Sequence, residues 1–270
     1  MQGIQLASIG SGSKGNGTLL RTDTTCVLVD CGFSLKETER RLAMRGLSGA
    51  NITALLVTHE HGDHIGGVGV LSRRYGIPVY MSHGTHLSGR CDEVYQSICF
   101  DAGDSFQIND LTVQSVLVPH DARQPCQYVI ENQGLKIGIL TDLGSITPHV
   151  IESYGDCDHL LLEFNHDLEL LRSGPYPPSL KRRVGGSLGH LNNQQAADFL
   201  KRVDHAGLAS VLIAHVSEQN NSREHIEDAL RADLGETFNK HRYMSQAEGY
   251  HWVQLTEPSD LDYTPVAADA

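Results

Sequence analysis

Long apolar runs are absent from the 270-residue sequence, and so is any N-terminal segment with the basic and apolar regions of a signal peptide. We therefore expect a protein with no membrane partner, located in the cytoplasm. Fixed-period repeats and low-complexity linkers are absent as well. Their absence favours a single domain over residues 1–258, followed by a flexible polar tail over residues 259–270.

Paired cysteines and an excess of basic residues are also missing. The six cysteines form no CxxC pair, so we expect reduced, mostly buried thiols. The 21 basic residues are outnumbered by 33 acidic ones, which gives a net charge of −12 and disfavours a non-specific nucleic-acid coat. A nuclease remains compatible with this charge, because divalent cations and a local basic patch reverse the field where a phosphate binds.

Histidine is present in excess. Three of the 15 histidines fall in the segment THEHGDHIGG, residues 58–67, together with two carboxylates. The zincin motif His-Glu-x-x-His does not account for it, because Asp63 stands where the second histidine belongs and His64 follows one residue late. Gly62 also lies inside the helix that a zincin needs, where it costs about 1 kcal/mol relative to alanine. The role of this segment therefore depends on what surrounds it.

The apolar pattern indicates strand-rich halves with interspersed helices. Runs rich in β-branched residues, for example 52–58 and 209–215, predict buried strands. Residues 34–46 predict a helix that opens with the capping-box pair Ser34 and Glu37. Two sheets packed together and covered by helices satisfy this pattern, so we predict an α/β fold with a four-layer αββα sandwich.

Four predicted strands end at residues that bind metals in other proteins. Residues 59–64 follow one of them, and His120, Asp142 and His215 end the runs VLVPH, GILTD and VLIAH. Any one of these alone is better explained as a surface histidine or a turn aspartate, because both are common. Their recurrence at four strand ends favours one shared site at the edge of the sheets.

This arrangement resembles the metallo-β-lactamase fold superfamily. HEHGDH at residues 59–64 is similar to its His-x-His-x-Asp-His motif, and His120, Asp142 and His215 match its later ligand positions in the same order. Asp30, in VDCG, matches an aspartate that supports the ligands. The resemblance covers residues 3–255 and implies two divalent cations. It assigns His59, His61 and His120 to one ion and Asp63, His64 and His215 to the other, with Asp142 bridging them.

Within the superfamily the sequence is similar to the YycJ/WalJ group. The shared strings are GSGSKGNGT near the start, EFNHD at 163–167, PPSLKRRVGGSLGHLNN at 177–193 and AHVSEQNNS at 214–222. The group is associated with 5′-to-3′ exonuclease activity on DNA. The resemblance therefore implies a metal-dependent phosphodiesterase with DNA as its partner, and both a monomer and a homodimer are compatible with it.

The resemblance also implies a mechanism. Two cations about 3.5–4 Å apart clamp the attacking and leaving oxygens of a phosphodiester and lower the pKa of a shared water. The nucleophile is then the hydroxide that bridges the two ions, and Asp63 is the catalytic residue that orients it or takes its proton. Imidazoles suit zinc, whereas carboxylates and a phosphate substrate also suit manganese. Glu60 is not expected among the ligands.

Further residues are candidates for phosphate or nucleic-acid contacts. His190, in GGSLGHL, is the candidate for protonating the leaving group or binding phosphate; its alternative is an incidental loop histidine. The basic segment before it suits a phosphate backbone, and a solvated helix is the alternative. GSGSKGNGT lacks the ending of a P-loop, yet its backbone N–H groups can hold a phosphate. The candidates are Ser13, Asn16, His166, Lys181, Arg182, Arg183 and His190.

Other functions use the same metals. A hydrolase of small cyclic or activated phosphodiesters is the first alternative, and a thioester or lactone hydrolase is the second. The basic Gly-rich segment over residues 181–190 argues against the second, because those reactions need no phosphate contact. A purely structural metal site is disfavoured because such sites use four closed ligands, usually with cysteine, and no cysteine belongs to this set.

Overall fold

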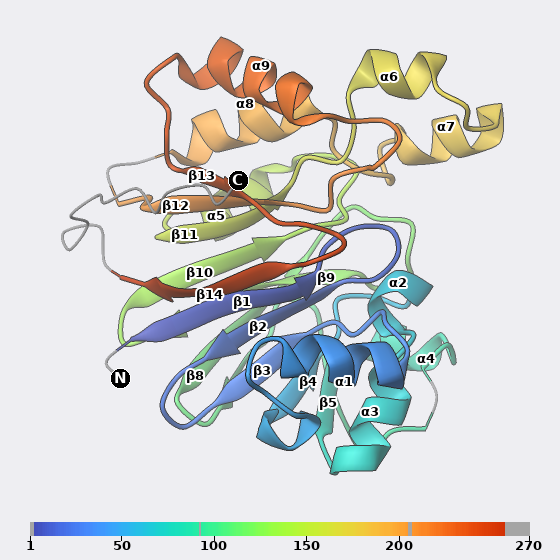
Figure 1. Ribbon diagram of the computed structural model, residues 1–270, viewed down its shortest axis with the longest axis vertical. Coiled ribbons are helices and arrows are strands. Elements are labelled where there is room, and N and C mark those ends of the chain that lie inside the picture. Colours follow the sequence, from blue (N-terminus) through green and yellow to red (C-terminus); the bar gives the residue numbers. More distant parts are fainter. Residues whose placement is uncertain (1–2, 92, 205–206, 257–270) are drawn as a thin grey trace.

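The computed structural model describes residues 3–91, 93–204 and 207–256 of the chain. Two sheets lie face to face in the middle, with helices on both outer sides (Figure 1). The predicted four-layer αββα sandwich is therefore confirmed. The predicted tail over residues 259–270 lies outside the described residues.

The first sheet has the strand order β14-β1-β2-β3-β4-β5-β6. From β14 to β3 neighbouring strands are antiparallel, and from β3 to β6 they are parallel. The strands are β1 (Ile4–Gly10), β2 (Gly17–Arg21), β3 (Cys26–Val29), β4 (Ala54–Leu56), β5 (Pro78–Ser82), β6 (Gln96–Phe100) and β14 (Tyr250–Leu255).

The second sheet repeats this pattern with the order β13-β12-β11-β10-β9-β8-β7. Neighbouring strands are antiparallel from β7 to β10 and parallel from β10 to β13. The strands are β7 (Ser105–Ile108), β8 (Leu111–Leu117), β9 (Cys126–Asn132), β10 (Leu135–Leu140), β11 (His159–Glu163), β12 (Ser210–Ala214) and β13 (His241–Tyr243).

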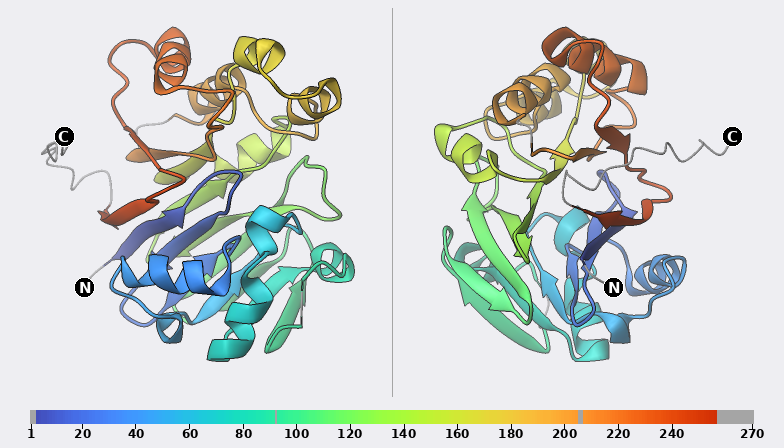
Figure 2. Two further views of the ribbon diagram at one scale, coloured as in Figure 1. Left: turned by 45° about the vertical axis from the view of Figure 1, so that its right-hand side comes forward. Right: turned by 90° about the vertical axis from the view of Figure 1, so that its left-hand side faces the viewer.

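Helices cover the outer face of each sheet, and two short ones project beyond the sandwich near its upper right in Figure 1. Figure 2 shows the same layers edge-on. The first sheet is covered by α1 (Leu35–Ala43) and α3 (Val68–Tyr75), and the second by α5 (Pro148–Tyr154), α8 (Asn193–Val203) and α9 (Arg223–Leu234). The projecting pair is α6 (Leu168–Ser173) and α7 (Pro178–Val184). The remaining short helices are η1 (Gly49–Asn51), α2 (Gly62–Ile65) and α4 (His83–Leu87).

Three apolar clusters fill the spaces between the four layers. The central cluster joins residues of both sheets, for example Leu56 of β4 and Ile139 of β10. One outer cluster packs Leu42 of α1 on the first sheet, and the other packs Phe199 of α8 on the second. Each such buried side chain contributes roughly 1.5–3 kcal/mol. The sheets are thus fixed on both faces, and they present their strand ends as a rigid edge.

Local capping differs from the prediction at one helix. The side chain of Ser34 makes no capping hydrogen bond at the start of α1, so the predicted capping box is wrong. Glu37 instead pairs with Arg40 and Arg41 one turn further on. Ser222 does cap α9, because its Oγ accepts the backbone N–H of His225. Within the described ranges, none of the helices combines the length and the apolar character needed to cross a bilayer.

Candidate metal centre

Histidine and carboxylate side chains from the ends of several strands meet at one edge of the two sheets. The parallel strands β3 and β4 bring Asp30 and residues 59–64 to this edge, and β10 and β12 bring Asp142 and His215. Among the described residues, the side chains form overlapping groups whose ligand atoms lie within 4.8 Å of one another. The groups are His59, His61 and His120; His59, His64 and Asp142; Asp63, His64 and His215; and Asp142, His190 and His215.

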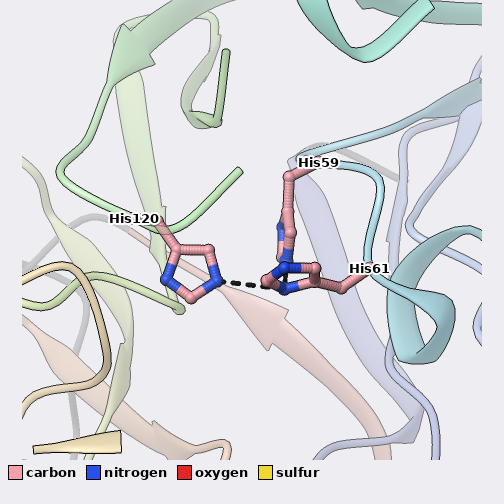
Figure 3. Close-up of side chains that lie close together, drawn as sticks. All are labelled: His59, His61 and His120. Atoms are coloured by element: carbon pink, nitrogen blue, oxygen red, sulfur yellow. Dashed lines mark hydrogen bonds between the residues drawn. The ribbon is translucent and has the colours of Figure 1, made fainter. Parts of the chain in front are cut away.

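The first group is a set of three histidines from two loops (Figure 3). Nδ1 of His61 lies 3.0 Å from Nε2 of His59 and 3.2 Å from Nε2 of His120. His59 is completely buried, and His120 is 5% exposed. Nδ1 of His120 lies 3.0 Å from the carbonyl oxygen of Gly189, to which it donates. This bond leaves Nε2 of His120 to point toward the other two rings.

We call Asp63, His64 and His215 the second group. Its two histidines lie beside two carboxylates, those of Asp63 and Asp142. Nε2 of His64 lies 3.5 Å from Asp63 and 3.3 Å from Asp142, and Nε2 of His215 lies 3.7 Å from Asp63. Asp142 belongs both to a group with His64 and to a group with His215. The sequence assigned this aspartate a bridging position, and its place between the groups is compatible with that assignment.

Asp30 and Thr58 contact His64 on the Nδ1 side of its ring. Oδ2 of Asp30 accepts a hydrogen bond from Nδ1 of His64 at 2.8 Å and another from the hydroxyl of Thr58 at 2.8 Å. Its Oδ1 accepts the backbone N–H of Thr58 at 2.9 Å. A carboxylate on Nδ1 fixes the tautomer of a ligand histidine and turns Nε2 toward the metal position. These contacts are compatible with the supporting role that the resemblance implies for Asp30.

Glu60 is buried and holds the neighbouring loop. Its Oε1 accepts the backbone N–H of Arg123 at 2.7 Å, which ties the loop after β4 to the loop that carries His120. Its Oε2 is buried without a hydrogen-bond partner among the described residues. Glu60 is absent from the ligand groups. It is neither a ligand in this geometry nor a solvated carboxylate.

Glu163 is a further carboxylate of the site, and the sequence analysis predicted no role for it. It is completely buried at the end of β11, where Oε1 accepts the backbone N–H groups of Leu143 at 2.9 Å and Leu191 at 3.1 Å. Its Oε2 lies 3.1 Å from Nδ1 of His190 and 3.5 Å from Nδ1 of His215. Glu163 ends a buried apolar strand as the other candidates do, so the same pattern contained the signal.

Neighbouring carboxylates favour the protonated forms of His64 and His215, the two histidines of the second group. Burial opposes protonation of His64, but Asp142 and Asp30 outweigh it and raise the pKa of His64 well above 6.5. Burial is likewise outweighed at His215, where Asp142 is the largest favourable influence and the pKa rises to about 10. Protons on these rings and a divalent cation compete for the same positions, because metal binding needs the neutral imidazole.

The pKa values of two histidines of the first group, His59 and His120, shift in the opposite direction. Burial, reinforced by His64, holds the pKa of His59 well below 6.5, and burial also lowers the pKa of His120. Both rings are therefore neutral near pH 7, which is the protonation state that a metal ligand requires. These two rings need no proton release before they bind a cation.

The donor set fits a divalent metal. Oδ2 of Asp142 and both ring nitrogens of His215 are buried without hydrogen-bond partners among the described residues. Unpaired buried polar atoms are costly, and coordination to a cation satisfies them. The groups offer imidazole and carboxylate donors and no thiolate. That chemistry suits zinc or manganese.

Three residues of the site have left-handed backbone conformations. The φ angles are 61° for Asp30, 54° for Asp142 and 49° for His215. Residues other than glycine rarely adopt this region, and such strain gathers at functional sites. Asp30 and His215 directly follow β3 and β12, and Asp142 lies two residues after the end of β10, so the backbone turns sharply close to the point where each side chain enters the cluster.

Close backbone approaches join the loops of the site. A Cβ atom on Gly32 would lie 1.8 Å from the carbonyl oxygen of Asp63, and one on Gly144 would lie 2.4 Å from the backbone nitrogen of Gly189. The backbone N–H of Asn16 also donates to the carbonyl oxygen of Asp63 at 2.8 Å. Glycine at positions 32 and 144 therefore lets neighbouring loops touch directly.

A cavity of about 420 Å³ opens over the cluster. His61, Asp63, Asp142, His190 and His215 form part of its lining. The size falls within the range of small-molecule sites in proteins. The remaining lining residues are Ser13, Gly62, Arg90, Asp121, Tyr176, Leu180, Arg183, Val184 and Gly189.

The predicted phosphate contacts separate into two sets. Ser13, Arg183 and His190 line the cavity, and Arg183 pairs with Asp121 beside His61. The structure does not bring the other four candidates to it. Lys181 donates to the carbonyl oxygen of Arg172, and Arg182 is exposed outside the lining of the cavity. Asn16 is buried in the N-terminal loop. His166 is buried beside Asn165.

Burial lowers the pKa of His166 to about 4, and its Nε2 has no hydrogen-bond partner among the described residues. The side-chain amide of Asn16 bonds to the backbone of Gly12 in both directions, and its nitrogen lies 3.1 Å from Nε2 of His64. Both side chains are buried and outside the lining of the cavity. Arg90 and Tyr176 line the cavity, although no pattern in the sequence singled them out.

Residues 25–215 match the family described as Beta-lactamase superfamily domain. The chain is 37% identical over 227 residues to Exodeoxyribonuclease YycJ of Bacillus anthracis, which covers 82% of this chain and 86% of that protein. It is 34% identical over 245 residues to Exodeoxyribonuclease WalJ of Streptococcus pneumoniae, with coverages of 86% and 91%. The solved metallo-beta-lactamase fold protein YhfI from Bacillus subtilis matches with a TM-score of 0.71 at 16% identity, over 93% of this chain and 99% of that one.

The match to YhfI shows the fold alone, because the identity is low. The family match includes the residues of the cluster from Asp30 to His215, and the two similar sequences match more than four-fifths of the chain. The resemblance found in the sequence is thereby confirmed. The chain belongs to the beta-lactamase superfamily domain family and, within it, to the YycJ/WalJ group of metallo-β-lactamase fold hydrolases.

Proposed function

We propose that this protein is a metal-dependent phosphodiesterase that degrades DNA as an exonuclease, in the 5′-to-3′ direction. One observation carries the proposal: a histidine and carboxylate cluster lies in a cavity that also presents the cations of Arg90 and Arg183. Guanidinium groups bind phosphate oxygens in a fork geometry, so they suit a phosphodiester beside the cluster. The names of the YycJ and WalJ relatives support DNA as the substrate.

The proposed ligands are those that the sequence assigned. His59, His61 and His120 would hold one divalent cation; Asp63, His64 and His215 would hold a second, and Asp142 would contact both. When bound, two such ions lower the pKa of a water they share, so that hydroxide is available as the nucleophile near neutral pH. We propose zinc or manganese as the metal.

The protein side chains supply binding and proton transfer. Asp63 is about one-quarter exposed and lines the cavity, which supports the role that we propose for it, to orient the nucleophile or to receive its proton. His190 is held by Glu163 through Nδ1, which directs Nε2 away from the carboxylate. We propose that this ring protonates the leaving oxygen or binds the phosphate. Arg183, fixed by Asp121, limits how the substrate approaches His61.

The test is degradation of DNA by purified protein supplied with manganese or zinc. Duplexes labelled at the 5′ or the 3′ end report direction, and we expect 5′-phosphorylated ends to be shortened first. Asp63→Asn and His61→Ala should abolish turnover. His149→Ala is the matched control, because His149 is exposed on α5 and outside the ligand groups.

Other substrates separate the alternatives. Intact DNA together with hydrolysis of a cyclic phosphodiester or of bis(p-nitrophenyl) phosphate would replace the exonuclease by a small-phosphodiester hydrolase. Turnover of thioesters or lactones alone would contradict both. For His190→Ala, we expect lost turnover with metal content retained, measured by elemental analysis. Loss of metal would instead make His190 a ligand, a role that its group with Asp142 and His215 allows geometrically.

A further inference from the structure

A second cavity adjoins the one over the metal cluster. It has a volume of about 210 Å³ and shares two lining residues, Ser13 and Tyr176, with the first cavity. Its other walls include Lys14 of the N-terminal loop, Glu218 of the loop after β12, and Gln246. Because two residues line both cavities, the cavities lie side by side, and we refer to the two together as the trough.

Tyr176 lies at the junction of the two cavities. It belongs to the connection between α6 and α7, the pair of helices that projects from the sandwich in Figure 1. The side chain is half-buried and lines both spaces, so part of its ring borders the trough. Aromatic rings in nucleic-acid channels serve as platforms on which bases stack, irrespective of base identity. Tyr176 is therefore placed to receive a base next to the metal cavity.

Basic side chains lie on both sides of this tyrosine. Arg90 and Arg183 line the metal cavity, and Lys14 lines the second cavity. The guanidinium of Arg90 has no ion-pair partner among the residues described. Lys14 pairs with Glu218 at 2.6 Å, but both side chains are largely exposed, at 71% and 53%. Such exposed pairs are weak, so a phosphate can replace the glutamate.

We propose that the trough is a nucleotide subsite for the residue next to the cleaved phosphodiester. Its base stacks on Tyr176, and the following phosphate binds Lys14, while the phosphate to be cleaved lies between Arg90 and Arg183. The inference rests on the proposed function and specifies the ligand further. The ligand is an unpaired strand end, because a base reaches the face of a tyrosine only when it has left the duplex stack.

The test combines a change in the protein with a change in the DNA. Single-stranded oligonucleotides carry one abasic position at the first, second or third nucleotide from the degraded end. In the wild-type protein, the abasic position that empties the subsite should lower kcat/KM about 5- to 150-fold, the range of stacking on an aromatic side chain. In Tyr176→Ala the intact oligonucleotide should already show this loss, and the abasic position should add little.

Matched variants separate stacking from folding. Tyr176→Phe keeps the ring and should restore the sensitivity to the abasic position. Tyr95→Ala is the control, because Tyr95 is 63% exposed and outside both cavities. Lys14→Ala should weaken oligonucleotide binding and reduce its dependence on salt, since one phosphate contact is lost. Lys201→Ala, an exposed lysine on α8, should do neither.

Two results would overturn the subsite. One is an abasic position that lowers kcat/KM equally in wild type and Tyr176→Ala. The other is a Tyr176→Ala variant that loses turnover of bis(p-nitrophenyl) phosphate as fully as turnover of DNA, since that compound has no neighbouring nucleotide. Anisotropy of a fluorescent oligonucleotide, measured in the Asp63→Asn background, separates the two proposals. If wild type cleaves no DNA but Tyr176 still determines the abasic effect on binding, the exonuclease proposal fails and the subsite stands.

Discussion

Replacement of Glu163 by glutamine removes one negative charge from the centre of the cluster and preserves the shape of the side chain. The carboxylate accepts three hydrogen bonds within 3.1 Å, two from backbone N–H groups and one from His190. A hydrogen bond to a charged group is worth about 1.5–3 kcal/mol and one between neutral groups about 0.5–1.5 kcal/mol. The substitution therefore costs roughly 1 kcal/mol per bond, or about 3 kcal/mol in all.

The pKa of Glu163 leads to the same magnitude. Burial acts to raise it, but His190 and His215 outweigh burial and lower it from 4.5 to about 2. That difference corresponds to roughly 3 kcal/mol of stability at neutral pH. Because the folded pKa is depressed, this stability is present above pH 4.5 and is lost as the pH falls toward 2. Lowering the pH from 7 to 3.5 should remove about 1 kcal/mol of it.

Urea unfolding of the metal-free protein tests this reasoning. We expect Glu163→Gln to lower the free energy of unfolding by about 3 kcal/mol at pH 7 and by about 2 kcal/mol at pH 3.5. Glu152→Gln is the control, because Glu152 is an exposed glutamate on α5. A loss below about 1 kcal/mol at pH 7, or a loss that is the same at both pH values, would refute the assignment of Glu163 as a stabilising carboxylate.

Three other substitutions or treatments have defined outcomes. Asp30→Asn should keep the fold, since asparagine tolerates a positive φ. It should weaken metal binding about 10- to 100-fold, measured by competition with a chelator, because His64 loses its anionic partner. Gly32→Ala should lower the free energy of unfolding by about 3 kcal/mol or more, whereas Gly62→Ala, with open space around its Cβ, should change it by less than about 0.5 kcal/mol. Ellman's reagent at pH 8 should label two thiols of the folded protein quickly and all six only after denaturation, because burial raises the pKa of the other four thiols. The slow thiols should be Cys26, Cys31, Cys126 and Cys157, and the fast ones Cys91 and Cys99.

The long-range features of the fold were predictable because buried strands leave a strong mark on the sequence. The runs that became β4, β10 and β12 are almost entirely buried, and apart from Lys136 and Ser210 their residues are apolar or glycine. The short helix α7 has no buried residue, and β6 is half exposed. Neither has an apolar periodicity from which a helix or a strand could be predicted.

The metal cluster was predictable for a different reason. Apart from His190, its histidines and carboxylates are contiguous at 59–64 or lie within three residues of the end of a strand, and parallel strands bring such ends to one edge. Which cation of the basic segment, residues 181–183, faces the cavity was not predictable in this way. Successive helical residues point about 100° apart, so only one of three neighbouring cations faces a given cavity. The sequence cannot tell Arg183, which lines the cavity, from Lys181, which bonds to the end of α6.

The left-handed backbone at Asp30, Asp142 and His215 has a consequence for how variants of this protein are selected. Each such residue costs about 1–3 kcal/mol, and glycine adopts the conformation without that penalty. Glycine at position 215 therefore relieves backbone strain while it removes a ring from the cluster. A library screened only for heat resistance would keep such a change wherever the relief of strain exceeds the loss of packing, and it would then recover more stable chains that lack a side chain of the cluster. Thermostable descendants of this fold should therefore be selected for bound metal as well as for melting temperature.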